Sequence, residues 1–333
     1  MKFSVVFSIL LLTLIAANIF GQSTIDFNKP KHIRVGEAYS YIIAQEFSLD
    51  RIKNQFSQFG MYILKAKNAF NSTFGRSREG MKKYLIEYLG QNEFINYEVQ
   101  LNNELKKMFG SQMFTKENAT NYILEVEGRA KGNIVSPVLE TILSFQFSDS
   151  PQDEFISGFT STFKTKTHAK AKNTDWQIKV PMSWKAEEAD RPNIIKKFSS
   201  DYGAGNQSIM LIVKEFPPTK KQVLKKKELD DFFSDEEMKK MVPDGGKYIS
   251  FTKMTLDGNI GGMVEFQMTI ERLDTQIQIR MVQFMFFRNN MLYVLQGTVA
   301  SDHMDGDLSF EMKKYLPLYR LVANSIVVNE QYR

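Results

Sequence analysis

The sequence predicts an α+β protein, in which an N-terminal helical region is followed by an antiparallel sheet flanked by helices. Between residues 39 and 109 apolar side chains recur at every third or fourth position, which is the period of amphipathic helices. No proline interrupts the chain between Pro30 and Pro137. After residue 175, apolar and polar side chains alternate in several segments, as in half-buried strands. The predicted parts are a signal peptide (1–21), a helical domain (22–118), a strand-rich connector (119–172) and an α+β domain (173–333).

The N-terminus has the pattern of a secretory signal peptide. Lys2 is the only charge before a mainly apolar run from Phe3 to Phe20, and polar sequence follows. The run is about long enough to span a bilayer, so a retained anchor is the alternative. The small residue Gly21 favours cleavage before Gln22. We therefore expect an exported protein, periplasmic or extracellular, with no transmembrane segment after cleavage.

Composition excludes several classes of function. The chain has no cysteine, which excludes disulfides, cysteine nucleophiles and thiolate metal sites. Its formal net charge of +5 is the difference between 43 basic and 38 acidic residues. Nucleic-acid binding requires positive charge clustered on one face, so this mixed balance predicts no nucleic-acid partner. The 27 Phe, 13 Tyr and 17 Met residues supply enough apolar area for globular cores.

The helical domain is expected to consist of several amphipathic helices packed on one another. Apolar residues with helical spacing lie at 39–63, 81–89 and 97–109. Glycine is common at helix ends and in turns. Four glycines therefore mark the expected ends of these helices: Gly60, Gly75, Gly90 and Gly110.

The connector has strand signals around a short helix. Tyr122, Leu124 and Val126 alternate with other residues, which predicts a strand, and a helix is predicted at 137–147. Strict alternation from Phe163 to Lys172 predicts a second strand.

This second strand would carry its lysines on one face, with His168 among them. The face has two interpretations: an anion-binding strip, or the solvated face of an edge strand, where lysine discourages unwanted pairing. Its lysines are Lys164, Lys166, Lys170 and Lys172.

A charged helical segment is predicted at 219–241, within the α+β domain. Ser234 and Glu237 have the spacing of a capping box. A basic block, Lys225, Lys226 and Lys227, precedes acidic residues. This arrangement indicates either pairing within the helix or an exposed docking helix. In the same way, Phe232 and Phe233 would anchor a partner or attach the helix to its own sheet.

The clearest pattern of the sequence is a three-stranded meander. Asp257-Gly258-Asn259 is a tight-turn signal, and strands are predicted at 264–270, 277–287 and 291–300. The second strand becomes apolar on both faces by Met281, which indicates a central strand covered on both sides. A C-terminal helix is expected at 308–324. Its predicted buried stripe is Phe310, Tyr315, Leu318, Leu321 and Val322.

Several of these features occur together between about Asp175 and Val328. They are the pattern Trp176-x-Ile178-x-Val180-Pro181-x-x-Trp184, the turn at Asp257-Gly258, the meander, and a final helix ending in Ser325-Ile326-Val327. This half of the chain resembles the PsbP-like superfamily, which includes an extrinsic photosystem subunit, a Ran-binding nuclear import factor and many bacterial envelope proteins. The resemblance implies an antiparallel sheet flanked by helices and supplies no catalytic residue. The N-terminal half resembles no family that we identify.

No pattern of catalytic or metal-binding residues emerges. His32, His168 and His303 are far apart and follow no ligand spacing. The acidic loop at 302–307 lacks EF-hand spacing, and capping of the following helix explains its acids better. No serine lies in a G-x-S-x-G motif. We therefore expect no catalytic residue, no metal and no cofactor.

Three functions remain as hypotheses. The first is a non-enzymatic binding or assembly-accessory protein of the cell envelope with a protein partner. Its candidate partner-binding residues are Lys225, Lys226, Lys227, Phe232, Phe233, Lys164, Lys166, Lys170 and Lys172. The second is a carrier of a small apolar or anionic ligand. The third is a hydrolase with carboxylate catalysis that no motif reveals.

Overall fold

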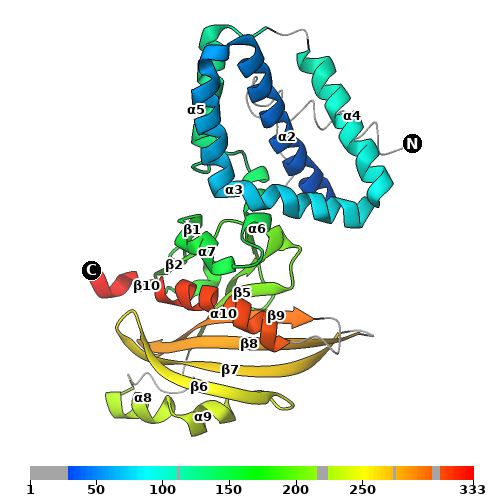
Figure 1. Cartoon of the computed structure of the whole chain (residues 1–333). Helices are drawn as coiled ribbons and strands as arrows, with labels where there is room; N and C mark the ends of the chain where they lie inside the picture. The colour runs from blue at the N-terminus through cyan, green and yellow to red at the C-terminus, as the bar shows by residue number, and fades with distance from the viewer. Residues whose placement is uncertain (1–28, 111–112, 216–223, 273–274, 302–307) are drawn as a thin grey trace. The chain divides into compact units, whose positions relative to one another are not determined.

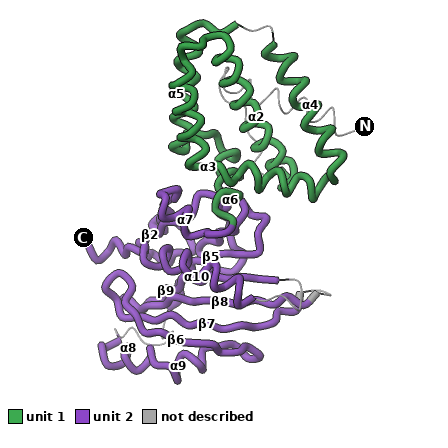
Figure 2. Tube along the Cα trace, in the orientation of Figure 1, with its two compact units in different colours: residues 1–148 green, residues 149–333 purple. Residues whose placement is uncertain are grey.

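The computed structural model describes residues 29–110, 113–215, 224–272, 275–301 and 308–333. The chain forms two compact units, Met1–Ser148 and Asp149–Arg333 (Figure 2). The predicted signal peptide and the acidic loop at 302–307 lie outside the described residues.

The first unit is helical, as the spacing of its apolar residues predicts (Figure 1). Its helices are α2 (Lys31–Gln55), α3 (Gly60–Leu89), α4 (Gln91–Phe109), α5 (Lys116–Arg129) and α6 (Val138–Gln146). Gly90 separates α3 from α4 with a φ of 86°, a left-handed conformation that glycine adopts without steric cost. The expected helix end at Gly75 is wrong, because α3 continues through this residue. The largest side chains of the core include Tyr39, Phe74 and Phe94, which are at most 1% exposed.

Buried polar contacts join α2 to its neighbours. The Arg129 guanidinium of α5 lies 4.9 Å from the Tyr41 ring and 5.3 Å from the Tyr122 ring. Its Nη1 donates a hydrogen bond to Gln45 on α2. Such a stacked, hydrogen-bonded arginine fixes two helices in one geometry.

The predicted strand around residues 122–126 is wrong, because this segment belongs to α5. Ala119, Ile123 and Val126 are buried at helical spacing, whereas Leu124 is 58% exposed. The Thr115 hydroxyl caps the helix by accepting the Asn118 amide. Helices continue through Gln146, so the first unit extends beyond the predicted boundary at residue 118.

The second unit contains a seven-stranded antiparallel sheet with strand order β3-β4-β5-β9-β8-β7-β6 (Figure 1). Its strands are β3 (Lys185–Glu187), β4 (Ile194–Ser199), β5 (Gln207–Glu215), β6 (Lys247–Leu256), β7 (Asn259–Arg272), β8 (Thr275–Arg288) and β9 (Met291–Ser301). A three-stranded sheet combines β1 (Thr160–Lys164), β2 (Trp176–Pro181) and β10 (Val327–Val328). The helices of this unit are α7 (Pro151–Ile156), α8 (Lys226–Phe232), α9 (Asp235–Lys240) and α10 (Leu308–Asn324). The predicted α+β class, with an antiparallel sheet flanked by helices, is confirmed.

The predicted meander is confirmed as strands β7 to β9, and β6 extends it by one strand. The β6–β7 turn places Asp257 and Gly258 at φ 45° and 76°, and the β8–β9 turn places Asn289 and Asn290 at 49° and 62°. Two consecutive residues with positive φ are the signature of the type I′ turn, whose twist suits an antiparallel hairpin.

The large sheet has an apolar core on each face, as predicted for its central strand. Val282, Phe284 and Phe286 of β8 belong to a core with Trp176 and the buried side of α10. The alternating residues Met281, Met285 and Phe287 belong to a second core with Phe233 and Met238 of the α8–α9 segment. Alternation of side chains along a strand thus supplies both cores from one strand.

The C-terminal helix α10 occupies the predicted residues, but one member of its predicted stripe is wrong. Phe310 is 66% exposed, whereas Met312 and Tyr319 are buried. The Tyr319 hydroxyl donates to the carbonyl of Thr298 on β9, which fixes the side of α10 that faces the sheet.

Two aspartates attach the C-terminal residues to this unit. The Asp257 carboxylate accepts hydrogen bonds from the Val328 amide, the Gln331 side chain and the Tyr332 hydroxyl, at 2.5 to 2.6 Å. Asp175 accepts from the Asn329 side chain at 2.8 Å and forms an ion pair with Arg333.

Candidate functional site

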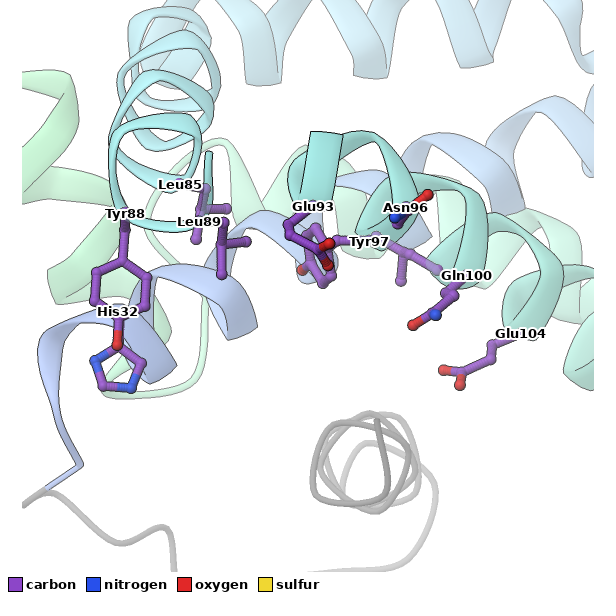
Figure 3. A pocket seen from close by; sticks show the side chains of 10 residues that line it. His32, Leu85, Tyr88, Leu89, Glu93, Asn96, Tyr97, Gln100 and Glu104 are labelled. Carbon is purple, nitrogen blue, oxygen red and sulfur yellow. The ribbon is translucent and has the colours of Figure 1, made fainter. Parts of the chain in front are cut away.

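The helical unit contains a half-open groove of about 300 Å³ (Figure 3). Three segments form it: the start of α2, the end of α3, and about the first four turns of α4. Its apolar lining consists of Leu85, Leu89, Leu101, Tyr88 and Tyr97. Its polar lining consists of His32, Glu93, Asn96, Gln100 and Glu104.

The sequence of α4 accounts for the wall that this helix contributes. Glu93, Tyr97, Gln100 and Glu104 follow one another at intervals of three or four residues, so they project from the same face of the helix. Leu101 and Leu105 next to this face are buried and pack against α2. The wall is therefore built on a helix that is fixed by its own core.

Polar contacts also hold α4 against α2. The Tyr97 hydroxyl lies 2.7 Å from the Ser40 hydroxyl and donates to the Gly36 carbonyl at 3.2 Å. The Tyr39 hydroxyl donates to Glu98 at 2.5 Å. Burial raises the pKa of Tyr97, so its phenol stays neutral. Because its hydroxyl is engaged with α2, Tyr97 presents an aromatic surface to the groove.

A row of aromatic side chains lies at the end of the groove that the start of α2 and the end of α3 form. The His32 ring stacks on Tyr88, with centroids 4.5 Å apart and an interplanar angle of 11°. Tyr88 lies parallel to Tyr84 of the preceding turn at 6.3 Å. Figure 3 shows His32 and Tyr88 at one end of the groove and Glu104 at the other. Tyr88 is 48% exposed, so its ring is accessible to a ligand.

The charge of the groove differs in sign from that of the whole chain. Of the ten lining residues that the structure describes, Glu93 and Glu104 are carboxylates and none is lysine or arginine. The whole chain has a formal net charge of +5. The groove therefore combines an apolar floor, aromatic surfaces and a locally negative rim, which suits it for binding.

The predicted lysine strip does not form, because the strand ends at Lys164. The buried Thr165 hydroxyl donates to the Thr174 carbonyl at 2.9 Å and accepts from the Trp176 amide. The Thr165 carbonyl accepts from the His168 amide, which closes a turn. Lys170 then lies in a short 3-10 helix, and Lys172 follows it with a φ of 52°. Burial of Thr165 thus overrides the alternating pattern.

The residues of this turn contact a neighbouring loop. The Lys170 ammonium donates to the Ala189 carbonyl, and His168 Nε2 lies 3.2 Å from the Glu188 carboxylate. Lys196 donates to Glu188 at 2.5 Å, and this hydrogen bond is the main cause of the lowered pKa of Glu188. Lys164, Lys166, Lys170 and Lys172 do not share one strand face.

The second group of predicted site residues lies at the start and end of α8. Lys225, Lys226 and Lys227 are exposed. Phe233 is 1% exposed, and its ring and that of Phe232 lie 5.7 and 4.9 Å from the Phe287 ring of β8. The two phenylalanines therefore attach α8 to its own sheet, which was one of the two interpretations.

Of the predicted capping box, the N-cap hydrogen bond of Ser234 is confirmed in the adjacent helix. The Ser234 hydroxyl accepts the Glu237 amide at the start of α9. The predicted helix at 219–241 is divided at this point, and residues 216–223 lie outside the described part of the chain.

Sequence reasoning missed the groove. In the sequence, His32 is a histidine with no ligand spacing to another one, and Tyr97 and Leu101 belong to an apolar stripe expected to form a core. The signal that points to the groove is the polar and aromatic spacing from Glu93 to Glu104 beside that stripe. It indicates one face of a helix but not which other helices meet it.

The described residues contain neither a cluster of metal ligands nor a helix able to cross a membrane. No three His, Cys, Asp or Glu side chains within 29–110, 113–215, 224–272, 275–301 and 308–333 are grouped to hold a metal ion. Across the same ranges no helix has both the length and the apolar character needed to cross a membrane.

The sequence matches no family model and no curated protein. Solved structures do match about half of the chain. Cyanobacterial PsbP from Synechocystis is 13% identical, with a TM-score of 0.30, over 51% of this chain and 94% of its own. LpqN of Mycobacterium tuberculosis, described as involved in cell envelope biogenesis, is 14% identical, with a TM-score of 0.29, over 54% and 96%. The Ran-binding protein Mog1p of Saccharomyces cerevisiae is 9% identical, with a TM-score of 0.30, over 51% and 96%.

These neighbours are PsbP-like, as the sequence resemblance predicts for part of the chain. At identities of 9% to 14% and TM-scores of 0.29 to 0.30, these likenesses assign no function to this chain.

Proposed function

We propose that the protein is an exported, non-enzymatic binding protein of the cell envelope, and that its helical unit binds a ligand in the groove between α2, α3 and α4. Export rests on the signal-peptide pattern at residues 1–21. Binding rests on one observation, the half-open groove with its leucine floor and its accessible tyrosine. Concave, mainly apolar sites with a few placed polar groups are the usual form of ligand pockets.

Removal of the Tyr88 ring is expected to weaken ligand retention about tenfold or more, which corresponds to about 1.4 kcal/mol. The tagged full chain is recovered from its native envelope, and bound molecules are quantified by native mass spectrometry. Tyr88→Ala removes a groove surface that is already 48% exposed, so the fold is expected to tolerate it.

Val99→Ala is the matched control, because Val99 is 53% exposed on α4 and lies outside the lining. We expect this variant to retain the ligand as the wild type does. Equal retention by both variants would show that the groove is not the binding site.

A second proposal concerns a protein partner at the start of α8. Lys225, Lys226 and Lys227 are exposed, and the segment is attached to its sheet by Phe232 and Phe233. Reversing the three charges to glutamate is expected to abolish capture of a crosslinked partner without changing stability. Quantitative mass spectrometry against a tag-only control measures this, and an unchanged set of captured proteins would contradict it.

A further inference from the structure

We infer that the groove selects an elongated amphiphilic cation, that is, an apolar chain carrying an ammonium or guanidinium group. The inference rests on the proposed binding function and adds the chemical class of the ligand. It follows from the shape of the groove, from the sign of its charge and from the nature of its aromatic surfaces.

Shape favours a slender ligand. The wall on α4 runs from Glu93 to Glu104, and eleven residues of helix correspond to about 16 Å. The volume of about 300 Å³ is small for a groove of that length, at the lower end of the range of ligand pockets. Leu85, Leu89 and Leu101 provide an apolar floor. A long, thin apolar chain fills such a space better than a compact ring system.

Charge favours a cation. Glu93 and Glu104 lie on the same face of α4, and the described lining contains no lysine or arginine. The nearby Lys31 ammonium lies 4.9 Å from the Tyr84 ring and 5.7 Å from the Phe145 ring, where these aromatic faces attract it. A carboxylate, sulfate or phosphate head group in the groove would be repelled by the exposed Glu93 carboxylate. The structure thus disfavours the anionic ligand that the sequence left open.

Aromatic surfaces support the same choice. Tyr97 stands four residues after Glu93 on α4, so a carboxylate and an aromatic face project together into the groove. Cations are attracted both to a carboxylate and to the face of a tyrosine ring. In a half-open site, partial exclusion of water strengthens both attractions relative to bulk solvent.

The test compares three probes that share one decyl chain and differ in head group: decyltrimethylammonium, decyl sulfate and decyl maltoside. Each is titrated into the full-length protein below its critical micelle concentration, and binding is measured by calorimetry. We expect the ammonium probe to bind about tenfold or more tightly than the sulfate probe. Added salt is expected to reduce that difference, because it screens charges at a half-open rim.

The double variant Glu93→Gln/Glu104→Gln is expected to remove the preference for the cation while keeping affinity for the maltoside. Glu87→Gln is the control, because Glu87 is an exposed carboxylate of α3 that is outside the lining and pairs with Lys83. Circular dichroism confirms that each variant is folded.

The outcomes separate the inference from the proposed function. Tighter binding of the sulfate probe, equal binding of all three probes, or an unchanged preference in the double variant would overturn the choice of a cation and leave the groove as a binding site. Failure of all three probes to bind would overturn the inference as well. The proposed binding function is tested separately, by comparing the ligand retained by Tyr88→Ala with that retained by Val99→Ala.

Discussion

Replacement of Gly297 by alanine is expected to destabilise the α+β unit by about 2–3 kcal/mol, which is a large fraction of the stability of an ordinary domain. Gly297 lies in β9 between Ile209 of β5 and Val282 of β8. A Cβ at this position would lie 2.5 Å from two atoms of the Tyr319 ring. The ring is 0% exposed and its hydroxyl is bonded to Thr298, so neither the strand nor α10 has room to move.

Fluorescence during urea unfolding measures this effect directly. Trp176 and Trp184 are the two tryptophans of the chain, and both are buried in the α+β unit. The Trp184 ring lies 6.4 Å from the Tyr319 ring, so its emission reports on the packing in question. The expected result is a lower midpoint with an unchanged dependence on urea.

Two further variants separate the clash from other effects. Tyr319→Phe removes the hydrogen bond to Thr298 and is expected to cost about 1 kcal/mol. Combining Gly297→Ala with Tyr319→Leu is expected to cost less than the sum of the single changes, because the smaller side chain frees space for the new methyl group. Full additivity would show that the two residues do not compete for the same volume.

Replacement of Asp257 by alanine is expected to lower the free energy of unfolding by about 3 kcal/mol or more. The carboxylate holds Val328, Gln331 and Tyr332 by hydrogen bonds, and bonds to a charged acceptor are stronger than neutral ones. Alanine is also disfavoured at the left-handed φ of 45°. We expect the C-terminal residues to detach, which limited proteolysis after residue 324 would reveal together with a lower free energy of unfolding.

A matched variant isolates the backbone contribution. Asn289 occupies the same position in the β8–β9 turn with a φ of 49°. Asn289→Ala therefore carries a similar backbone cost without detaching the C-terminus. Asparagine at position 257 tolerates the left-handed conformation but lacks the charge. Asp257→Asn is therefore expected to lower the free energy of unfolding by an intermediate amount. Equal losses for Asp257→Ala and Asn289→Ala would contradict a role for the carboxylate.

The parts of the fold that sequence predicts well are those decided by local chemistry. The β6–β7 and β8–β9 turns need two residues that accept positive φ, and Asp257-Gly258 and Asn289-Asn290 supply them. The bounds of α10 and the N-cap of α9 by Ser234 follow from equally local rules.

The errors lie where burial decides between two local patterns. Residues 122–126 alternate but also place Ala119, Ile123 and Val126 at helical spacing, and packing selects the helix. Alternation through Lys172 is interrupted because Thr165 is buried and bonded to Thr174. The sequence patterns do not predict the groove for a related reason. Its residues come from three helices, and the contact between these helices depends on the tertiary packing of the whole unit.

The attachment of the C-terminus has a consequence for the order in which the chain folds. Strands β6 to β9 pair with their neighbours in sequence, so their contacts close short loops and form quickly. The bond between Asp175 and Asn329 joins residues 154 positions apart and closes a long loop at a higher cost in entropy. Asp257 takes part in both the short-range and the long-range contacts. It lies in the turn of the first hairpin, and its carboxylate binds the C-terminal residues. The meander is thus expected to form before the C-terminal residues bind to it and complete the domain.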